Sequence, residues 1–176
     1  MPDSPAARAA QASATTDAVF AIRATAFDSP AVGVMTDAVQ DYYRSIYDGP
    51  DRAPVDIGEF TAPRGMFFVG SADGVPVAMG GWRWIDPVQG LPATQPVEVK
   101  RMYVDAAMRG RGYAKQLLQC LETTARDAGA DAIVLSTGSP QVEAIGLYRS
   151  SGYDDVPRFG YYAAYPNAVH LGKILA

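Results

Sequence analysis

The sequence has very few of the residues that form disulfides and metal sites. Its 176 residues include one cysteine, Cys120, and one histidine, His170. A single cysteine cannot form an internal disulfide, and these two residues cannot complete a Cys/His zinc cluster. These absences exclude a disulfide-bonded scaffold and structural zinc. Carboxylate-bound Mg²⁺ or Ca²⁺ is not excluded by composition, but we expect no metal.

Positive charge and long apolar runs are also scarce. The 15 Lys and Arg residues are outnumbered by 19 Asp and Glu residues, which gives a formal net charge of -4. Nucleic-acid binding draws on a basic surface, and we expect no such partner. No apolar run approaches the ~20 residues of a membrane span, and the alanine-rich residues 1–18 lack the apolar segment of a secretory signal. We therefore expect a soluble cytoplasmic protein with no membrane contact.

The residues that are present suffice for one globular domain. Hydrophobic residues make up 48% of the chain, and a chain of this length can bury roughly 70% of its unfolded surface. The usual ~150 residues per domain also favour one domain over two. Because Val19 is the first large apolar side chain after Met1, we expect residues 1–18 to be a mobile tail and residues 19–176 to form the domain.

Hydrophobic periodicity predicts an α+β arrangement. Asp73 and Gly74 form a strong hairpin signal between two strands, and a proline-rich loop is predicted over residues 51–64. The predicted strands cover residues 19–26, 66–71, 75–85, 97–104, 133–136 and 169–175, and the predicted helices cover residues 32–46, 114–128 and 140–152.

A turn rich in glycine and arginine precedes the second predicted helix. It reads Arg-Gly-Arg-Gly-Tyr-Ala over residues 109–114. Backbone N–H groups and the positive end of a helix attract anions, and glycines allow a phosphate to approach the main chain. No Gly-Lys-Ser/Thr sequence is present, and Lys115 replaces the third glycine of a dinucleotide motif. The remaining interpretations of this turn are a phosphate-binding site of another kind and a solvated basic turn.

This turn resembles the acetyl-CoA motif of the GNAT superfamily of N-acetyltransferases, Gln/Arg-x-x-Gly-x-Gly/Ala. Arg109, Gly112 and Ala114 fit every defined position. The resemblance extends to residues 97–104, 142–153 and 171–175, which are similar to the family's fourth strand, a helix with a tyrosine near the thiol, and the closing strand. It implies a single GNAT-like α/β domain with a mixed, mostly antiparallel central sheet, flanking helices and two splayed central strands.

The resemblance also implies acetyl-CoA as the acyl donor. The pyrophosphate would lie on the glycine-rich turn, and main-chain N–H groups of the fourth strand would stabilise the developing oxyanion. The residues expected to bind the cofactor are Met102, Tyr103, Val104, Arg109, Gly110, Arg111, Gly112, Tyr113, Ala114 and Lys115.

Two residues are expected to move protons. Glu98 is similar in position to the glutamate that many family members use as general base, directly or through water, and Tyr148 is the candidate general acid for the leaving thiolate. Strict alternation places Glu98 on the same face as Lys100 and Met102, but a bulge would change that parity. The alternatives are an ion-paired strand residue for Glu98 and a core tyrosine for Tyr148.

The sequence does not name the acceptor. The expected reaction is direct attack by a primary amine of a small molecule on acetyl-CoA in a ternary complex. An exposed protein amine and an acyl-CoA sensor without turnover are the alternatives, and a homodimer is left open. Core packing explains most aromatic residues, so we expect only one or two members of a larger set to line the acceptor pocket: Tyr42, Tyr43, Tyr47, Trp82, Trp84, Tyr161, Tyr162 and Tyr165. Cys120 and His170 are expected to be structural.

Overall fold

The computed structural model describes residues 19–47 and 49–175, so the predicted tail lies outside the described residues. Helices and strands alternate along the chain much as the periodicity predicts. The elements are β1 (Phe20–Ala24), α1 (Pro30–Ile46), η1 (Ile57–Phe60), β2 (Gly65–Ala72), β3 (Val75–Trp84), β4 (Pro96–Val104), η2 (Ala106–Met108), α2 (Tyr113–Asp127), β5 (Ala132–Gly138), α3 (Val142–Ser150), β6 (Asp154–Asp155), η3 (Tyr161–Ala164) and β7 (Ala168–Ile174).

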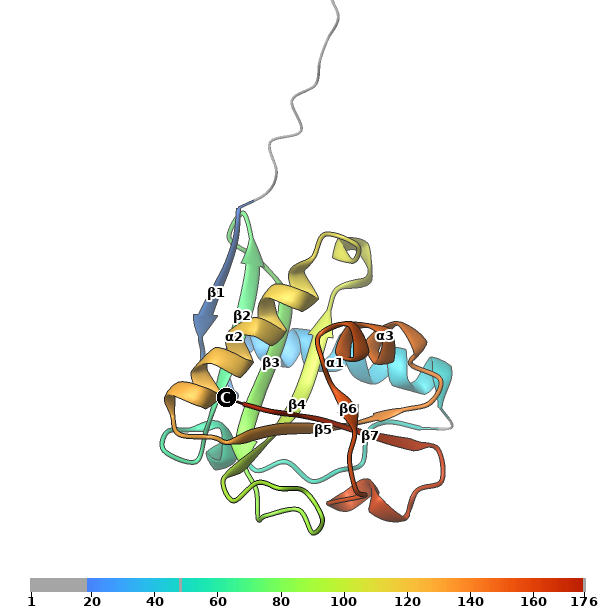
Figure 1. The fold of residues 1–176 in the computed structure, drawn as a ribbon. Coiled ribbons are helices and arrows are strands. Elements are labelled where there is room, and N and C mark those ends of the chain that lie inside the picture. The colour runs from blue at the N-terminus through green and yellow to red at the C-terminus, as the bar shows by residue number, and fades with distance from the viewer. Residues whose placement is uncertain (1–18, 48, 176) are drawn as a thin grey trace, which may run out of the picture.

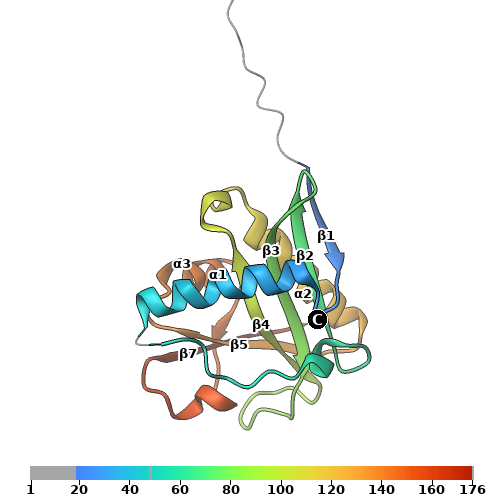
Figure 2. The ribbon, with the colours of Figure 1, turned by 180° about the vertical axis from the view of Figure 1, so that it is seen from behind.

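The strands form one mixed sheet. Its order is β1-β2-β3-β4-β5-β7-β6, and β4 and β5 are a parallel pair while their neighbours are antiparallel. Helix α2 packs on one face, toward the viewer in Figure 1, and α1 crosses the opposite face, as the reverse view in Figure 2 shows. The predicted α/β fold with a mostly antiparallel sheet is confirmed.

The larger core lies between α2 and the sheet. Leu117, Leu118, Leu121 and Ala125 repeat at the spacing of one helix face, and all four are fully buried. They pack against the inward side chains of the central strands, which include Val97, Val99, Ile133 and Leu135. A second cluster joins α1 to the other face through Val32, Met35, Val39, Phe67 and Met79. The two cores hold the central strands between helices.

Strand β4 contains a bulge in its second half. Arg101 and Met102 together face Gly80 of β3, and Arg101 adopts a left-handed φ of 56°. A Cβ on Gly80 would lie 3.3 Å from the Met102 Cα, so glycine permits this close approach. The bulge reverses the alternation after Lys100, so Val99 and Met102 both face the α2 core.

Helix α3 is shorter than predicted. It begins at Val142, and its N-cap is Gln141 rather than Ser139. The Ser139 N–H donates to the Asn167 carbonyl at 2.9 Å, which ties this residue to the segment before β7. Tertiary contact therefore overrides the local Ser-Pro signal for a helix start.

Candidate active site

The central strands separate halfway along their length. Strand β4 pairs with β5 only from Pro96 to Glu98, opposite Ala132 to Val134. Beyond that point β4 continues to Val104 beside β3, and β5 continues to Gly138 beside β7. The splay that the sequence predicts is present, and it leaves main-chain and side-chain groups of both strands facing an opening.

Two cavities of similar size meet at this opening. The first, about 460 Å³, lies at the start of α2 and is called the α2 cavity. The second, about 470 Å³, is lined by Tyr43, Tyr47, Tyr162 and Tyr165 and is called the tyrosine cavity. They share five lining residues, Tyr43, Met102, Gln141, Ala144 and Tyr148. A ligand in one cavity can therefore contact a ligand in the other only beside these residues.

The α2 cavity is built as an anion site. Gly112 is the N-cap of α2 with a φ of 79° and no side-chain cap, and Gly110 has a φ of 75°. A Cβ on either glycine would meet no atom within 4 Å, so open space lies over both. The first N–H groups of α2 have no intrahelical partner and lie at the positive end of the helix dipole. This arrangement fits a pyrophosphate.

Nearly all predicted cofactor-binding residues line the α2 cavity. The Arg109 Nε–H donates to the Val104 carbonyl at 3.3 Å, and its guanidinium lies 5.2 Å from the Tyr42 ring centre. Arg111 is exposed and is the one predicted residue that does not line the cavity. Those that do are Met102, Tyr103, Val104, Arg109, Gly110, Gly112, Tyr113, Ala114 and Lys115.

Tyr148 lies where the two cavities meet. It is 6% exposed, and its hydroxyl donates to the Met102 sulfur at 3.6 Å, a weak acceptor. Burial raises the pKa of Tyr148 well above its usual range. The phenol is therefore protonated at neutral pH. Because the Met102 sulfur accepts its hydrogen bond only weakly, a ligand atom that is a stronger acceptor could take the place of this sulfur.

Glu98, the predicted general base, does not line either cavity. Its Oε2 accepts from Arg83 Nε at 3.1 Å and Arg83 Nη2 at 2.8 Å, and its Oε1 lies 3.6 Å from Lys100 Nζ. Arg83 also pairs with Glu59. The bulge begins after Lys100, so it leaves Glu98 and Lys100 on one face. Its carboxylate is therefore bound by two cations, and its role as general base stays a prediction.

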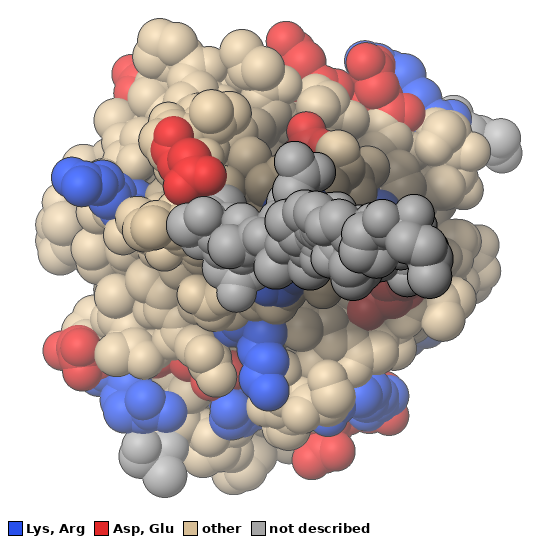
Figure 3. Space-filling model, turned by 90° about the horizontal axis from the view of Figure 1, so that it is seen from above, with Lys and Arg blue, Asp and Glu red and all other residues tan. Residues whose placement is uncertain are grey.

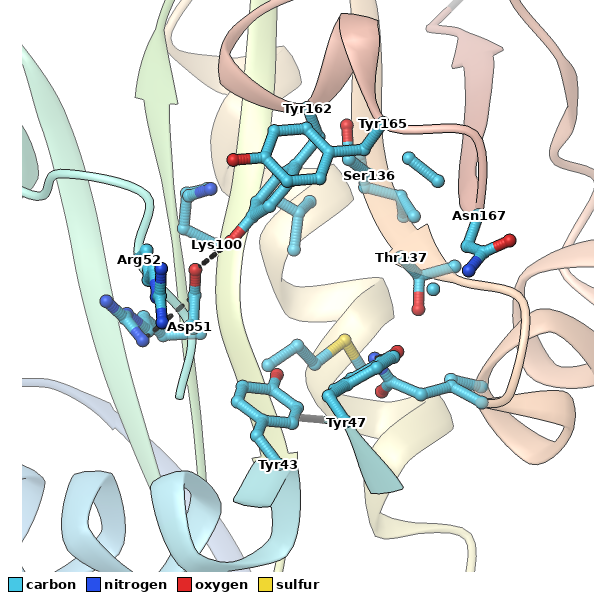
Figure 4. Close-up of a pocket in the computed structure, with 18 of the residues that line it drawn as sticks. Tyr43, Tyr47, Asp51, Arg52, Lys100, Ser136, Thr137, Tyr162, Tyr165 and Asn167 are labelled. Atoms are coloured by element: carbon cyan, nitrogen blue, oxygen red, sulfur yellow. Dashed lines mark hydrogen bonds and ion pairs between the residues drawn. The ribbon is translucent and has the colours of Figure 1, made fainter. Parts of the chain in front are cut away.

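An ion pair that sequence reasoning missed lines the tyrosine cavity. Asp51 Oδ2 lies 3.0 Å from Arg101 Nη1. Asp51 Oδ1 accepts from the Tyr162 hydroxyl and, at 3.0 Å, from the Ala53 N–H (Figure 4). Asp51 lies in the proline-rich loop, and nothing in that loop's pattern indicates that it reaches η3, far along the chain. The position of the bulge, which brings Arg101 into the cavity lining, is likewise not indicated by any pattern in the sequence.

A serine and the one histidine form a second polar pair beside this cavity. Ser136 and His170 are directly opposite in the β5/β7 register, and Ser136 Oγ lies 3.0 Å from His170 Nδ1. Burial lowers the pKa of His170, and the positive Arg158 lowers it further. Ser136 lines the cavity and His170 does not. The cavity therefore contains a hydroxyl next to a neutral, buried imidazole.

The tyrosine cavity holds more aromatic residues than predicted. Tyr43, Tyr47, Tyr162 and Tyr165 all line it, whereas we expected one or two from the larger set. The Tyr47 hydroxyl accepts from Gln141 Nε2 at 2.9 Å, and a Cβ on Gly138 would collide with that hydroxyl. Tyr47 thus packs against the end of β5 and closes one side of the cavity (Figure 4).

Charge on the surface is mixed. In the view from above, basic and acidic side chains form small separate groups on a mainly uncharged face (Figure 3). Among residues 19–47 and 49–175, no helix is long and apolar enough to cross a membrane. Over the same residues, no group of three or more His, Cys, Asp or Glu side chains is placed to hold a metal ion.

Comparison with known proteins identifies the class. Residues 33–153 match the Acetyltransferase (GNAT) family, and the chain is 32% identical to the "IAA acetyltransferase" of Azospirillum brasilense over 145 residues, which is 82% of this chain and 91% of that protein. This protein therefore belongs to the GNAT family of acetyltransferases.

Solved structures share its fold. An acyl-CoA N-acyltransferase from Klebsiella pneumoniae has a TM-score of 0.74 at 24% identity, with 89% of this chain and 98% of that chain covered. A GNAT acetyltransferase from Elizabethkingia anophelis, solved with acetyl-CoA bound, has a TM-score of 0.61 at 15% identity, with 89% and 98% covered.

Proposed function

We propose that this enzyme transfers an acetyl group from acetyl-CoA to a primary amine of a small molecule, by direct attack in a ternary complex. The observation that carries the proposal is the meeting of two cavities at Tyr148 and Met102. One cavity has the glycine turn and helix end that suit a pyrophosphate, and the other has polar and aromatic walls for an acceptor. Two bound substrates would have their reacting groups adjacent at the shared residues.

The α2 cavity is the proposed donor site. The turn at Gly110 and Gly112 and the first N–H groups of α2 would hold the pyrophosphate of acetyl-CoA, which supplies the activated acetyl group when bound. The bulge at Arg101 and Met102 interrupts the ladder between β3 and β4. Residues in such a bulge are left partly unpaired, so main-chain N–H groups there are proposed to stabilise the oxyanion that develops during attack.

Tyr148 is the proposed general acid. Its hydroxyl lies at the shared wall, and its present partner is a weakly accepting sulfur. A leaving thiolate is a stronger acceptor than a thioether, so the phenol would donate to it as charge develops. The raised pKa of Tyr148 makes complete proton transfer less favourable than for an ordinary tyrosine. A hydrogen bond that strengthens late in the reaction is therefore the proposed role.

Glu98 is proposed to act on the site through Lys100 rather than to take the amine proton itself. Its carboxylate lies 3.6 Å from Lys100 Nζ and accepts two hydrogen bonds from Arg83. It lines neither cavity, so it has no direct contact with an amine bound in one of them.

Substitution of Glu98 separates these two roles. For Glu98→Gln we expect about a tenfold loss in kcat/KM that is similar from pH 6 to 10, because Lys100 loses the charge that positions it. A direct base would give a loss that is largest near pH 7 and fades toward the acceptor pKa of ~10.4, where the amine loses its proton unaided. The matched control is Glu59→Gln, which removes the other carboxylate on Arg83.

The Ser136 and His170 pair is proposed to accept the proton of the attacking amine. As the new C–N bond forms, the nitrogen proton would pass to Ser136 Oγ while the serine proton passes to His170 Nδ1. The groups that set the charge of His170 are Arg158, which lowers its pKa, and the Tyr162 main chain and Glu98, which raise it less than burial and Arg158 lower it. The imidazole is therefore neutral at pH 7 and able to accept.

This proposal predicts a pH dependence with a definite sign. Protonation of the acceptor amine lowers kcat/KM steadily below its pKa of ~10.4. Because the pKa of His170 is lowered from about 6.5, a second and steeper fall in kcat/KM should begin only below pH 6.5, when the imidazole takes a proton. For Ser136→Ala we expect kcat/KM to be about tenfold lower at pH 7. NMR titration of the one histidine gives its pKa directly. The proposal is contradicted if the second fall in kcat/KM is absent or occurs at a pH that differs from the pKa of His170.

A thiol-release assay tests the overall function. The purified protein with acetyl-CoA and a panel of primary amines should release free thiol only when a suitable amine is present. A chain that binds acetyl-CoA tightly in calorimetry and releases no thiol with any amine would be an acyl-CoA sensor. A peptide panel run in parallel identifies a protein amine as acceptor if peptides alone are acetylated.

A further inference from the structure

The tyrosine cavity has an excess of positive side chains. Within the described part of the chain, its lining includes three cations, Arg52, Lys100 and Arg101, and one carboxylate, Asp51. An acidic protein with a net charge of -4 thus lines its acceptor cavity with more positive than negative charge. Because the lining has more positive than negative side chains, the cavity is suited to a ligand that carries negative charge.

One of these cations is paired with the carboxylate of the same lining. Arg101 Nη1 lies 3.0 Å from Asp51 Oδ2, and both side chains are largely buried, at 9% and 15% exposure. Asp51 is further held by the Tyr162 hydroxyl and the Ala53 N–H. The Arg101 and Asp51 charges therefore balance, and this pair connects β4 to the loop before η1. Lys100 and Arg52 have no carboxylate partner among the lining residues, because Glu98, which pairs with Lys100, lies outside the lining.

The side chain of Lys100 is placed to bind a ligand in the tyrosine cavity. Its side chain is 8% exposed, and its Nζ donates no hydrogen bond within the described residues. It forms an ion pair with Glu98 Oε1 at 3.6 Å, which is too long for a hydrogen bond, and it lies 5.7 Å from the Tyr162 ring centre. An ammonium has three N–H donors, so those of Lys100 can still bind a ligand. Figure 4 shows Lys100 and Arg52 on the same side of the cavity, near Tyr162.

We propose that the acceptor amine carries an oxyanion, a carboxylate or a phosphate, that binds to Lys100. The inference rests on the proposed function and adds the class of acceptor. Lys100 would donate charge-assisted hydrogen bonds to the oxyanion, and the exposed Arg52 would attract it at the rim. Lys100 and Met102 are two residues apart on β4, so an amine held by its oxyanion can reach the shared wall at Tyr148.

The test begins with the unmodified protein and three matched panels in the thiol-release assay. The first holds amino carboxylic acids, the second holds amines with a phosphate monoester, and the third holds the neutral amides or alcohols of the same skeletons. We expect kcat/KM to be at least tenfold higher for one of the two anionic panels than for its neutral counterparts. The better anionic panel identifies the oxyanion.

Lys100→Met then locates the effect. It should raise KM for the preferred anionic amines about tenfold, with kcat less affected, and leave KM for the neutral amines unchanged, because only the oxyanion contact is lost. Lys100→Arg should restore most of the affinity. Arg23→Met removes one positive charge from an exposed position of β1, away from both cavities. This variant should change KM neither for the anionic amines nor for the neutral ones.

The outcomes separate this inference from the function on which it rests. Thiol release that is as efficient with neutral amines as with anionic ones overturns the oxyanion site and leaves the acetyltransferase activity intact. The absence of thiol release with all three panels, despite acetyl-CoA binding, removes the proposed function itself. The comparison of panels uses only the unmodified protein, so it decides the matter even if Lys100→Met does not fold.

Discussion

Tyr148→Phe should lower kcat about 100-fold while the affinity for acetyl-CoA stays nearly unchanged. The substitution removes only a hydroxyl, which lies at the wall shared by the two cavities and donates to Met102 Sδ. Loss of a positioned proton donor typically costs ~10²-fold or more in rate, whereas the ring that fills the core is retained. Steady-state rates and calorimetry with acetyl-CoA measure the two quantities.

The matched control is Tyr153→Phe. Tyr153 is 1% exposed, its ring centre lies 5.6 Å from that of Tyr148, and it lines neither cavity. It should keep kcat within about twofold. A series of acetyl thioesters with leaving thiols of decreasing pKa should also shrink the Tyr148→Phe defect, because a stable thiolate needs less help. A defect equal for every leaving group would place Tyr148 among the packing residues.

The pH profile offers an independent check on Tyr148. Its raised pKa keeps the phenol protonated far into the alkaline range. A general acid of this kind produces no loss of kcat on the alkaline side below about pH 10, the usual tyrosine pKa. A fall in kcat between pH 8 and 10 that disappears in Tyr148→Phe would mean that the phenol ionises there, contrary to its buried environment.

The fold could be predicted because its signals are local. The helix α2 is amphipathic over its whole length, and Asp73 and Gly74 mark the hairpin between β2 and β3. The glycine-rich turn marks the start of α2, and its φ values of 75° and 79° are the conformations for which glycine is needed. The α2 cavity is built from such short-range patterns, and so nearly all of the predicted cofactor-binding residues line it.

The tyrosine cavity could not be predicted in the same way, because it is assembled from segments that lie far apart in the sequence. Asp51, Arg101 and Tyr162 meet from a loop, a strand and a 3-10 helix, and no spacing in the sequence connects them. The bulge at Arg101 also decides which side chains of β4 enter the cavity. Strict alternation would place Arg101 on the face opposite to Lys100 and Met102, whereas all three line the tyrosine cavity.

Gly112→Val should weaken acetyl-CoA binding about 100-fold. Gly112 has a φ of 79° at the N-cap of α2, and open space lies where its Cβ would be. If the pyrophosphate occupies that space, a branched side chain would displace it from the helix N–H groups. A hydrogen bond to a charged group contributes about 1.5–3 kcal/mol, and losing one or two of them corresponds to a Kd about 100-fold higher. Calorimetry with acetyl-CoA measures the change.

The control must separate lost binding from backbone strain. Gly129 follows the other end of α2 with a φ of 99°, its Cβ would also meet nothing within 4 Å, and it lines neither cavity. Gly129→Val therefore imposes a similar left-handed strain, and both variants should lose thermal stability. Only Gly112→Val should also lose acetyl-CoA affinity. Equal affinities in the two folded variants would show that the space over Gly112 is not where the donor's phosphates bind.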